Sequence, residues 1–281
     1  MAMRGWWQDL TDLVLPTECA GCGAPRTVLC PRCRSALGGA GPRRVRPVPE
    51  PPGLPVVRAA APYAGEVREL LLAHKERGAL ALTGALGAAL AGVVRAGLRA
   101  GGGGPVLLVP VPSARWAVRA RGHDPVRRMA LAAAGQLRRA GTSARVAAVL
   151  RQRRAVADQA ELGARQRLEN LAGALEVTAG GAALLSGGRV VLVDDLITTG
   201  ASLAEAARAL REASLSRSGV RSAVYTAVTR EGRGERRIGA RPEREMWVHG
   251  APEMAASNAA GETLQAAVIA APRDSFEINR N

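Results

Sequence analysis

The chain has 281 residues, enough for one large domain or for a domain with attached segments. Nearly half of the residues (47%) are apolar but only 2% are aromatic, a composition that favours helices packed on a sheet over an aromatic-rich β-sandwich. The formal net charge is +15, and 13 Arg against four Asp and Glu between residues 110 and 170 supply +9 of it; this belt indicates a phosphate-bearing partner (a nucleotide, pyrophosphate or nucleic acid) or else a solvated Arg-rich face.

The first segment, MAMRGWWQDLTDLVLP, lacks the apolar core and the small-residue cleavage site of a secretion signal. The longest apolar stretch, residues 79–94, is shorter than the ~20 residues that a membrane-spanning helix needs. We therefore expect a cytoplasmic protein without membrane insertion. Disulfides are rare in that compartment, so the cysteines should serve another purpose.

Four cysteines lie together in CAGCGAPRTVLCPRC, where Cys19 with Cys22 and Cys30 with Cys33 form two C-x-x-C turns. Each turn can direct two thiolates at one ion, and two turns complete a tetrahedral all-thiolate zinc site. A redox dithiol would need only one such turn, whereas an iron–sulfur cluster would use the same ligands. Because no ligand position stays open for chemistry, we expect a structural metal that holds residues 1–38 as a small zinc finger.

Strand and helix patterns alternate along the middle of the chain. A Pro-, Gly- and Arg-rich stretch at 39–62 is interpreted as a linker whose end, VVRAAAP, has strand character, and residues 66–98 are helical with a break near Gly78. Next come a strand at 105–112, a helix at 125–139, a strand at 144–152, a basic loop at 153–170, strands at 173–178 and 189–195, a helix at 202–213 and a strand at 220–230. This order predicts an α/β fold with a parallel sheet flanked by helices. In residues 231–281 the apolar residues recur at neither helical nor strand spacing, and this segment is interpreted as a poorly ordered tail with room for one short helix.

The segment RVVLVDDLITTGAS joins a strand to a helix through an unusual turn. Val190–Val193 is typical of a strand buried on both faces, and apolar residues recur at helical spacing from Ser202 onward. Asp194, Asp195, two threonines and Gly200 stand between them. Because ligands of parallel sheets bind at the carboxyl ends of strands, this junction is a candidate binding site with both acids exposed in it.

The residue types of the junction suit a sugar phosphate. The backbone amides of residues 198–202 can converge on an anion, helped by the helix dipole and by the hydroxyls of Thr198, Thr199 and Ser202. Two carboxylates would repel a phosphate, but they can accept hydrogen bonds from the hydroxyls of a ribose. Phosphate on the turn and a diol on the acids together describe a 5-phosphoribosyl group.

The segment VVLVDDLITTGASL resembles the phosphoribosyl-diphosphate signature of type I phosphoribosyltransferases. The resemblance implies that Asp194 and Asp195 bind the ribose hydroxyls of phosphoribosyl pyrophosphate (PRPP), and that the turn, Ala201 included, binds its 5-phosphate. The rival interpretation is an ATPase strand whose acids hold a divalent ion. That rival needs an upstream glycine-rich loop ending in Lys and Ser or Thr, which GGGGPVLL does not supply.

Further motifs follow in the order seen in ComF-family proteins: the four-cysteine segment, HKERG, VPVPSARWAVRARG and RRAVADQAELGARQRLENLAGALEV. The chain resembles this family over about residues 15–230. The resemblance implies a small zinc finger joined to a phosphoribosyltransferase-like domain, here 63–230, and a part in natural DNA uptake. One departure is HDP at 123–125, where the family usually has Phe-Asn-Gln.

By this resemblance, the turn after LLVPVP is the pyrophosphate loop, and residues 154–170 stand in place of a mobile loop that closes over substrate. Ser113 and Arg115 are then the implied pyrophosphate ligands, and Arg115 and Arg165 the implied catalytic residues. Other positions that fit the family pattern are Lys75, Arg119, Arg121, Gln159 and Asn170. The alternative for these basic and polar side chains is an ordinary solvated surface.

Three functions remain open at this stage. The first is a transferase that displaces pyrophosphate from C1 of PRPP, with Mg²⁺ bridging the diphosphate and the ribose hydroxyls. The second is a single-stranded DNA-binding factor that works with competence machinery and holds phosphates with its basic belt and zinc finger. The third is a PRPP sensor without turnover. The sequence identifies no base-reading residues, and aromatic platforms for single strands are sparse.

Overall fold

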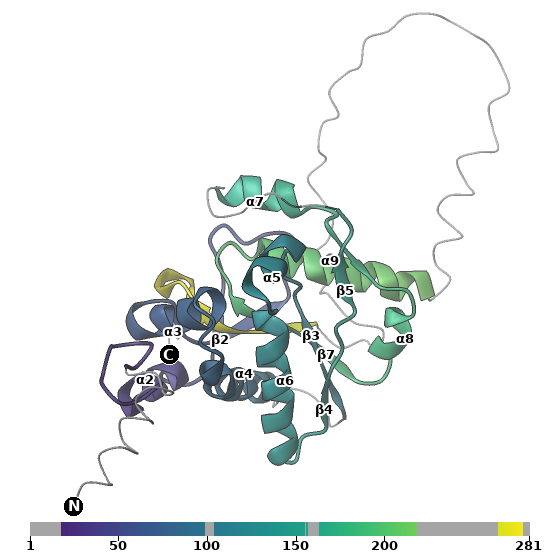
Figure 1. Ribbon diagram of the computed structural model, residues 1–281. Helices are drawn as coiled ribbons and strands as arrows, with labels where there is room; N and C mark the ends of the chain where they lie inside the picture. Colours follow the sequence, from purple (N-terminus) through teal and green to yellow (C-terminus); the bar gives the residue numbers. More distant parts are fainter. Residues whose placement is uncertain (1–17, 99–103, 155, 157–162, 218–263, 278–281) are drawn as a thin grey trace, which may run out of the picture.

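The computed structural model describes residues 18–98, 104–154, 156, 163–217 and 264–277. A six-stranded sheet in the order β1-β2-β8-β7-β3-β4 forms the centre, and every neighbouring pair is parallel except β1 with β2. The strands are β1 Arg43–Val45, β2 Val56–Pro62, β3 Val106–Pro110, β4 Ala144–Val146, β7 Arg189–Leu196 and β8 Gln265–Ala271. The mostly parallel sheet flanked by helices confirms the predicted α/β fold class (Figure 1).

Helices cover both faces of the sheet because its central strands are apolar on both. In β3, Val106 and Leu108 pack with the side chains of α3, α4 and α6, whereas Leu107 and Val109 pack on the opposite face with those of α9. The helices are α2 Pro31–Gly38, α3 Gly65–Glu76, α4 Thr83–Leu98, α5 Arg115–Arg121, α6 Pro125–Arg139 and α9 Ala201–Arg217. Figure 1 shows α4 and α6 side by side, and these two helices contact each other extensively.

Several predicted elements are confirmed closely. The helical stretch at 66–98 is divided into α3 and α4 by Gly78, which has a φ of 67°, and by a short 3-10 helix at Leu80–Leu82. The helix expected at 125–139 is α6, which starts at Pro125 because Asp124 accepts a hydrogen bond from the Arg127 amide (3.0 Å) and caps it.

A second sheet pairs β5, Leu150–Gln152, with β6, Leu175–Val177, in antiparallel fashion. Helix α7, Ala164–Leu171, lies between them in the chain, and α8, Gly181–Leu185, follows. We call β5, α7 and β6 the hood; Figure 1 shows its helix α7 at the top of the view. The single strand expected at 144–152 is therefore wrong, because the chain leaves β3 after residue 146 and pairs with β6 instead.

The linker predicted at 39–62 needs correction, because it contains β1 and β2. The three-residue β1 lies at the edge of the sheet, where nearby prolines and glycines are tolerated, and β2 pairs with β8 along its length. A Pro- and Gly-rich composition thus marked the turns around two short strands. The strand character expected for VVRAAAP is confirmed by β2.

The tail predicted at 231–281 also needs correction in one part. Residues 265–271 form β8, which lies between β2 and β7 in the middle of the sheet. Its sequence, QAAVIAA, is buried on both faces and so shows neither period of an amphipathic element. The strand expected at 220–230 and the rest of the tail up to residue 263 lie outside the described residues.

One helical stretch, Leu80–Leu98, is long and apolar enough to cross a membrane by length and composition alone. In the fold, this stretch belongs to the core: Leu82, Leu86 and Leu90 are fully buried, and α4 packs on α6 and β8. A buried core helix can have the same length and apolar composition as a membrane-spanning helix.

Candidate functional site

The turn between β7 and α9 depends on a glycine. Gly200 has a φ of 77°, a left-handed conformation that other residues adopt only with strain. A β-carbon at this position would also lie 3.1 Å from Leu54 Cδ1 and 3.2 Å from Pro51 Cγ. The Thr199 hydroxyl accepts a long hydrogen bond from the Ala201 amide (3.4 Å) at the start of α9. The turn is therefore shaped by its own side chains and by contact with residues 51–54.

The turn bounds two adjoining hollows. The smaller, of about 30 Å³, lies within the turn itself and is lined by residues 196–203 together with Asp194. The larger, of about 290 Å³, shares Asp194, Leu196, Thr198 and Ser202 with it. Amides at the start of α9, a helix of 17 residues, suit an anion in the smaller hollow. The larger one has room for the body of a ligand.

Asp194 and Asp195 lie near the end of β7, and they are only 9% and 6% exposed. The expectation that both acids are exposed is therefore wrong, although both still line the larger cavity. Asp195 Oδ2 lies 2.8 Å from Lys75 Nζ, and Asp194 Oδ1 accepts a hydrogen bond of 2.8 Å from the Asp195 amide. The two neighbouring acids thus have different partners.

These partners shift the pKa values of the two carboxyl groups in opposite directions. Burial and the neighbouring Asp195 raise the pKa of Asp194 well above its usual value. Burial would also raise the pKa of Asp195, but the ammonium group of Lys75 outweighs it and lowers that pKa. Asp195 in turn raises the pKa of Lys75. At neutral pH, Asp195 and Lys75 form an ion pair beside a carboxyl group that readily holds a proton.

The end of α3, which carries Lys75, is held by contacts with the end of α5 and with the loop between α5 and α6. His123 places Nε2 3.3 Å from the His74 carbonyl and Nδ1 3.1 Å from the Arg121 carbonyl. Arg121 makes two hydrogen bonds of 2.8 Å to the carboxylate of Glu76. The HDP sequence that departs from the ComF pattern thus has a local structural role: the histidine bridges two helix ends, and the aspartate and proline start α6.

The structure brings part of the predicted set of site residues together. Those that line the larger cavity are Lys75, Ser113, Arg121, Asp194, Asp195, Thr198 and Ser202. Thr199, Gly200 and Ala201 line the smaller hollow. Arg115 and Arg119 are exposed on α5, and Arg165 is exposed on α7, where it pairs with Glu169 at 2.9 Å. Asn170 closes α7 and its carbonyl accepts from Arg154, whereas Gln159 lies outside the described residues.

The remaining walls of the larger cavity include residues that the sequence interpretation did not single out. Gln152, Leu171 and Leu175 come from the hood, and Trp116, which is 54% exposed, comes from α5. No motif marks the hood residues, because they reach the cavity only through the pairing of β5 with β6. One side of the cavity is therefore charged and the other is largely apolar.

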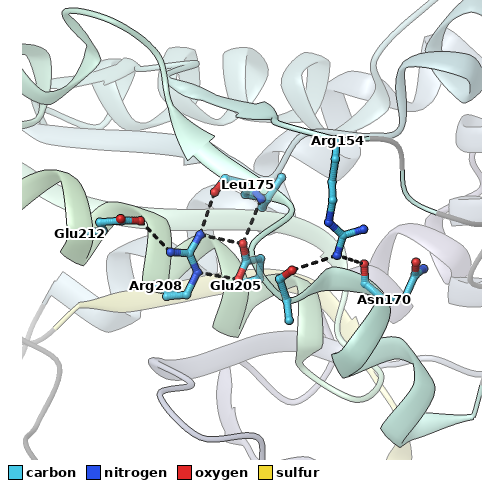
Figure 2. A network of polar contacts seen from close by, with 7 residues as sticks. Arg154, Asn170, Leu175, Glu205, Arg208 and Glu212 are labelled. Atoms are coloured by element: carbon cyan, nitrogen blue, oxygen red, sulfur yellow. Dashed lines mark hydrogen bonds and ion pairs between the residues drawn. The ribbon is translucent and has the colours of Figure 1, made fainter. Parts of the chain in front are cut away.

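Arg208 fastens the hood to α9, and Arg154 makes a contact within the hood (Figure 2). Glu205 of α9 is buried; its carboxylate accepts from the Leu175 amide (2.9 Å) and from Arg208, which itself donates to the Leu175 carbonyl (2.8 Å). Arg154 donates to the carbonyls of Asn170 and Ala172 at the end of α7. Helix α9 thus carries the binding turn at its first residue, Ala201, and holds the hood through Glu205, about one helical turn further along.

The stretch before β2 supports the turn from behind. Pro51 is buried and Leu54 half-buried, and both reach Gly200. Arg211 of α9 donates a hydrogen bond of 2.6 Å to the Gly53 carbonyl. We call residues 51–54 the buttress. This contact could not be predicted, because a Pro- and Gly-rich composition does not indicate which segment packs against the stretch.

The four cysteines form a cluster that fits a metal ion. All four Sγ atoms lie within 4.8 Å of one another, and Sγ of Cys22 and Cys30 are 3.5 Å apart. A tetrahedral zinc with Zn–S bonds of about 2.3 Å requires S···S distances of about 3.8 Å, so the arrangement suits it. Burial would raise the pKa of Cys19, but backbone hydrogen bonds from Cys30, Gly21 and Cys22 lower it to about 6. Burial and the other three cysteines raise the pKa of Cys33, so the four thiols can all ionise together only when a cation is bound among them.

The cluster packs directly on the domain. A β-carbon at Gly21 would lie 2.9 Å from Cys33 Sγ and 3.2 Å from Leu70 of α3. Arg32 of α2 pairs with Glu66 of α3 at 2.8 Å. The cysteine cluster therefore stands on the helix that carries Lys75 at its other end.

Comparison with known protein families matches residues 134–250 to the phosphoribosyl transferase domain. In the described part of the chain, the match includes the hood, β7, the turn and all of α9, and it confirms that the chain contains such a domain. The domain supports a PRPP-binding, transferase-like function. No curated protein matches the chain.

Proposed function

We propose that the chain binds PRPP at the carboxyl edge of its sheet and transfers the phosphoribosyl group to an acceptor. The main support is that the turn at 198–202 and the two acids border adjoining hollows, so that one sugar phosphate can touch both. The 5-phosphate would accept hydrogen bonds from the turn and from the first amides of α9. The ribose diol would then meet Asp194 and Asp195.

The charges of the two acids suit a diol. A ribose hydroxyl can both donate and accept a hydrogen bond. Ionised Asp195 can only accept, whereas Asp194, whose pKa is raised by burial and by its neighbour, can donate from its protonated form. The pair can therefore satisfy two hydroxyls without placing two full negative charges next to a phosphate ester.

The diphosphate of PRPP would extend toward the cationic side of the cavity. Ser113, Lys75 and Arg121 line it there, and Arg115 lies at the start of α5 directly after this loop. We keep Arg115 and Arg165 as the proposed catalytic arginines, since both side chains are exposed and the surface ion pair of Arg165 with Glu169 costs little to open toward a bound diphosphate. Arg119, Gln159 and Asn170 remain secondary candidates by the family pattern.

The proposed reaction is a displacement at C1 of the ribose. The bond from C1 to the pyrophosphate oxygen breaks with its electron pair on pyrophosphate, and a lone pair of the acceptor forms the new bond. Mg²⁺, when bound with PRPP, would neutralise charge on the diphosphate, and the carboxylate and hydroxyl oxygens of the cavity are the donors that this ion prefers. The cationic side chains of the cavity hold the leaving group in place.

The test is calorimetric titration of the full chain with PRPP and Mg²⁺, followed by an assay of pyrophosphate release with candidate acceptors. Asp195→Asn should weaken PRPP binding at least about tenfold, since it removes a charge-assisted acceptor. Glu212→Gln, further along α9, is the matched control and should bind normally. Unchanged affinity in Asp195→Asn would place the ligand elsewhere. Binding without pyrophosphate release under any condition would identify a sensor rather than a transferase.

We also propose that the protein is ComF-like and acts in nucleotide or DNA metabolism such as DNA uptake. The motifs that carry this resemblance are far apart in the sequence but meet in space: the cysteine cluster packs on α3, and Lys75 of HKERG pairs with Asp195. Single-stranded DNA binding is the second candidate, supported by the exposed Arg115, Arg119 and Arg127. Its affinity should fall steeply with salt, and a salt-independent affinity would exclude phosphate-mediated binding.

A further inference from the structure

We propose that Arg167 of the hood is the cation that binds the 5-phosphate of PRPP, so that two separate elements, the turn and α7, share this phosphate. The inference rests on the proposed function and adds a binding residue to the same site. Neither the phosphoribosyl signature nor the predicted set of site residues includes Arg167. The support comes from the lining of the smaller hollow and from the side of α7 that faces it.

The smaller hollow offers hydrogen-bond donors to a phosphate but no positive side chain. Its lining, Asp194 with residues 196–203, lies wholly in the described part of the chain and contains no Lys, Arg or His. Lys75 lines the larger cavity, where its ammonium group is already 2.8 Å from Asp195 Oδ2. A phosphate ester carries a charge of about −1.5 to −2 at neutral pH, so it binds more tightly where a cation accompanies the amides.

Arg167 brings a guanidinium group to the edge of this hollow. Its Nη1 donates a hydrogen bond of 3.4 Å to the hydroxyl oxygen of Thr198, a residue that lines both hollows. A hydrogen bond of this length is weak, so a phosphate oxygen beside Thr198 would be a better acceptor for the same guanidinium. The planar fork of an arginine also matches two oxygens of a phosphate at once.

Arg167 lies on the side of α7 that faces the site. Leu171, four residues later and therefore on the same side of the helix, is buried and lines the larger cavity. Arg167 itself is half-buried, whereas Arg165 and Glu169 are exposed and pair with each other at 2.9 Å. Of these two arginines, Arg167 is the one whose side chain reaches the turn.

Helix α7 is held at both ends. At its start the Gly163 amide donates to Gln166 Oε1 (2.9 Å), and at its end Arg154 donates to the Asn170 carbonyl (2.8 Å). The helix also packs on α9, which begins at the turn. An ordered helix therefore carries Arg167, and this lowers the entropic cost of its contact with a phosphate.

Ribose 5-phosphate and pyrophosphate are suitable probes, because they represent the two ends of PRPP. Calorimetric titration of the full chain measures the Kd of ribose 5-phosphate. Pyrophosphate is then titrated with Mg²⁺ into the chain saturated with ribose 5-phosphate, so that the turn is already occupied. Arg167→Gln should raise the Kd for ribose 5-phosphate about tenfold, since it removes a charge-assisted contact, and should change the Kd for pyrophosphate less than about twofold.

Two further variants test the role of the guanidinium. Arg167→Lys keeps the charge but loses the planar fork, so its Kd for ribose 5-phosphate should lie between those of the wild-type chain and Arg167→Gln. Arg151→Gln is the matched control, because Arg151 is an exposed hood residue whose partner at 2.8 Å is Glu176 on the surface. It removes the same charge from the same sheet and should change neither Kd.

The outcomes separate this inference from the proposed function. Wild-type affinity for ribose 5-phosphate in Arg167→Gln, equal losses for the two probes, or an equal loss in Arg151→Gln would each overturn the role of Arg167. If Arg167→Gln did not fold, wild-type affinity in Arg167→Lys would overturn it as well. A wild-type chain that bound neither ribose 5-phosphate nor PRPP would instead refute the proposed function.

Discussion

Removing the ammonium group of Lys75 is the most informative single perturbation of this site. Asp195 is held by one cation, Lys75 Nζ at 2.8 Å, and its side chain is 9% exposed whereas that of Lys75 is 33% exposed. Lys75→Met keeps most of the side-chain stem and removes the charge, which leaves a buried carboxylate next to Asp194. Loss of one partner of a buried pair costs about 3–5 kcal/mol, and the partial exposure of Lys75 places the expected loss in the free energy of unfolding at about 2–3 kcal/mol.

Urea denaturation across a pH series would measure this loss. In the wild-type chain Lys75 lowers the pKa of Asp195, so the stability from this pair is present above about pH 4, the unfolded value, and is lost as pH falls through the folded pKa. In Lys75→Met the same carboxyl group is buried without a cation, so its pKa rises and protonation relieves the strain. The difference between the two proteins should therefore be largest near pH 7.5 and should shrink toward pH 4.

Two further variants isolate the pair. Lys75→Met combined with Asp195→Asn removes both charges and should recover more than half of the lost stability, because no uncompensated charge remains. Arg68→Met, on the same helix but with an exposed partner in Glu69, should cost less than about 0.5 kcal/mol. If Lys75→Met were as stable as wild type at pH 7.5, or if the difference grew in acid, the ion pair would not have the role argued from its geometry.

Three other predictions follow from particular contacts. Burial lowers the pKa of His74 to about 4, so between pH 6.5 and 4 the imidazole takes up a proton in the unfolded chain but not in the folded one. The free energy of unfolding should therefore fall by about 3 kcal/mol over that window. The melting temperature of His74→Gln should fall less steeply with pH than that of the wild-type chain. A thiol-reactive mercurial should release about one zinc per chain and lower the melting temperature, and release of well under half an equivalent would contradict the four-thiolate site. Leu54→Ala in the buttress should raise the Kd for PRPP about tenfold, because the turn loses its support at Gly200, while Val48→Ala, 92% exposed in the same stretch, should leave that Kd unchanged.

Local patterns were sufficient for the elements that carry their own signal. Pro125 with Asp124 before it fixed the start of α6, and Gly78 fixed the break between α3 and α4. The turn at 198–202 was predicted as an anion site from its residue types, and the structure gives it a hollow. These features depend on backbone propensity and short-range hydrogen bonds, which can be predicted from neighbouring residues in the sequence.

Contacts between distant segments could not be predicted in the same way. The meeting of Lys75 with Asp195 joins residues 120 positions apart, and the buttress reaches the turn from a stretch whose composition suggested only a linker. The hood reaches the cavity because Leu175 is held by Glu205 and Arg208, and neither residue belongs to a recognised motif. Each of these contacts is specific, but none is accompanied by a periodic pattern of residues from which it could be predicted.

The burial of the two acids and the missed strand β8 have one common cause. Asp194 and Asp195 were expected to be exposed at the carboxyl end of a strand, because the β-branched run stops at Val193. In the fold, β8 pairs Asp194 with Val268 and Leu196 with Ala270, and the Ile197 amide donates to the Ala270 carbonyl (3.1 Å). Pairing with β8 thus extends β7 past its apolar run and encloses both acids. Since β8 supplies this wall, Asp195 needs Lys75 as a buried counter-ion, and the opposite shifts in the pKa of the two acids follow from the position of β8.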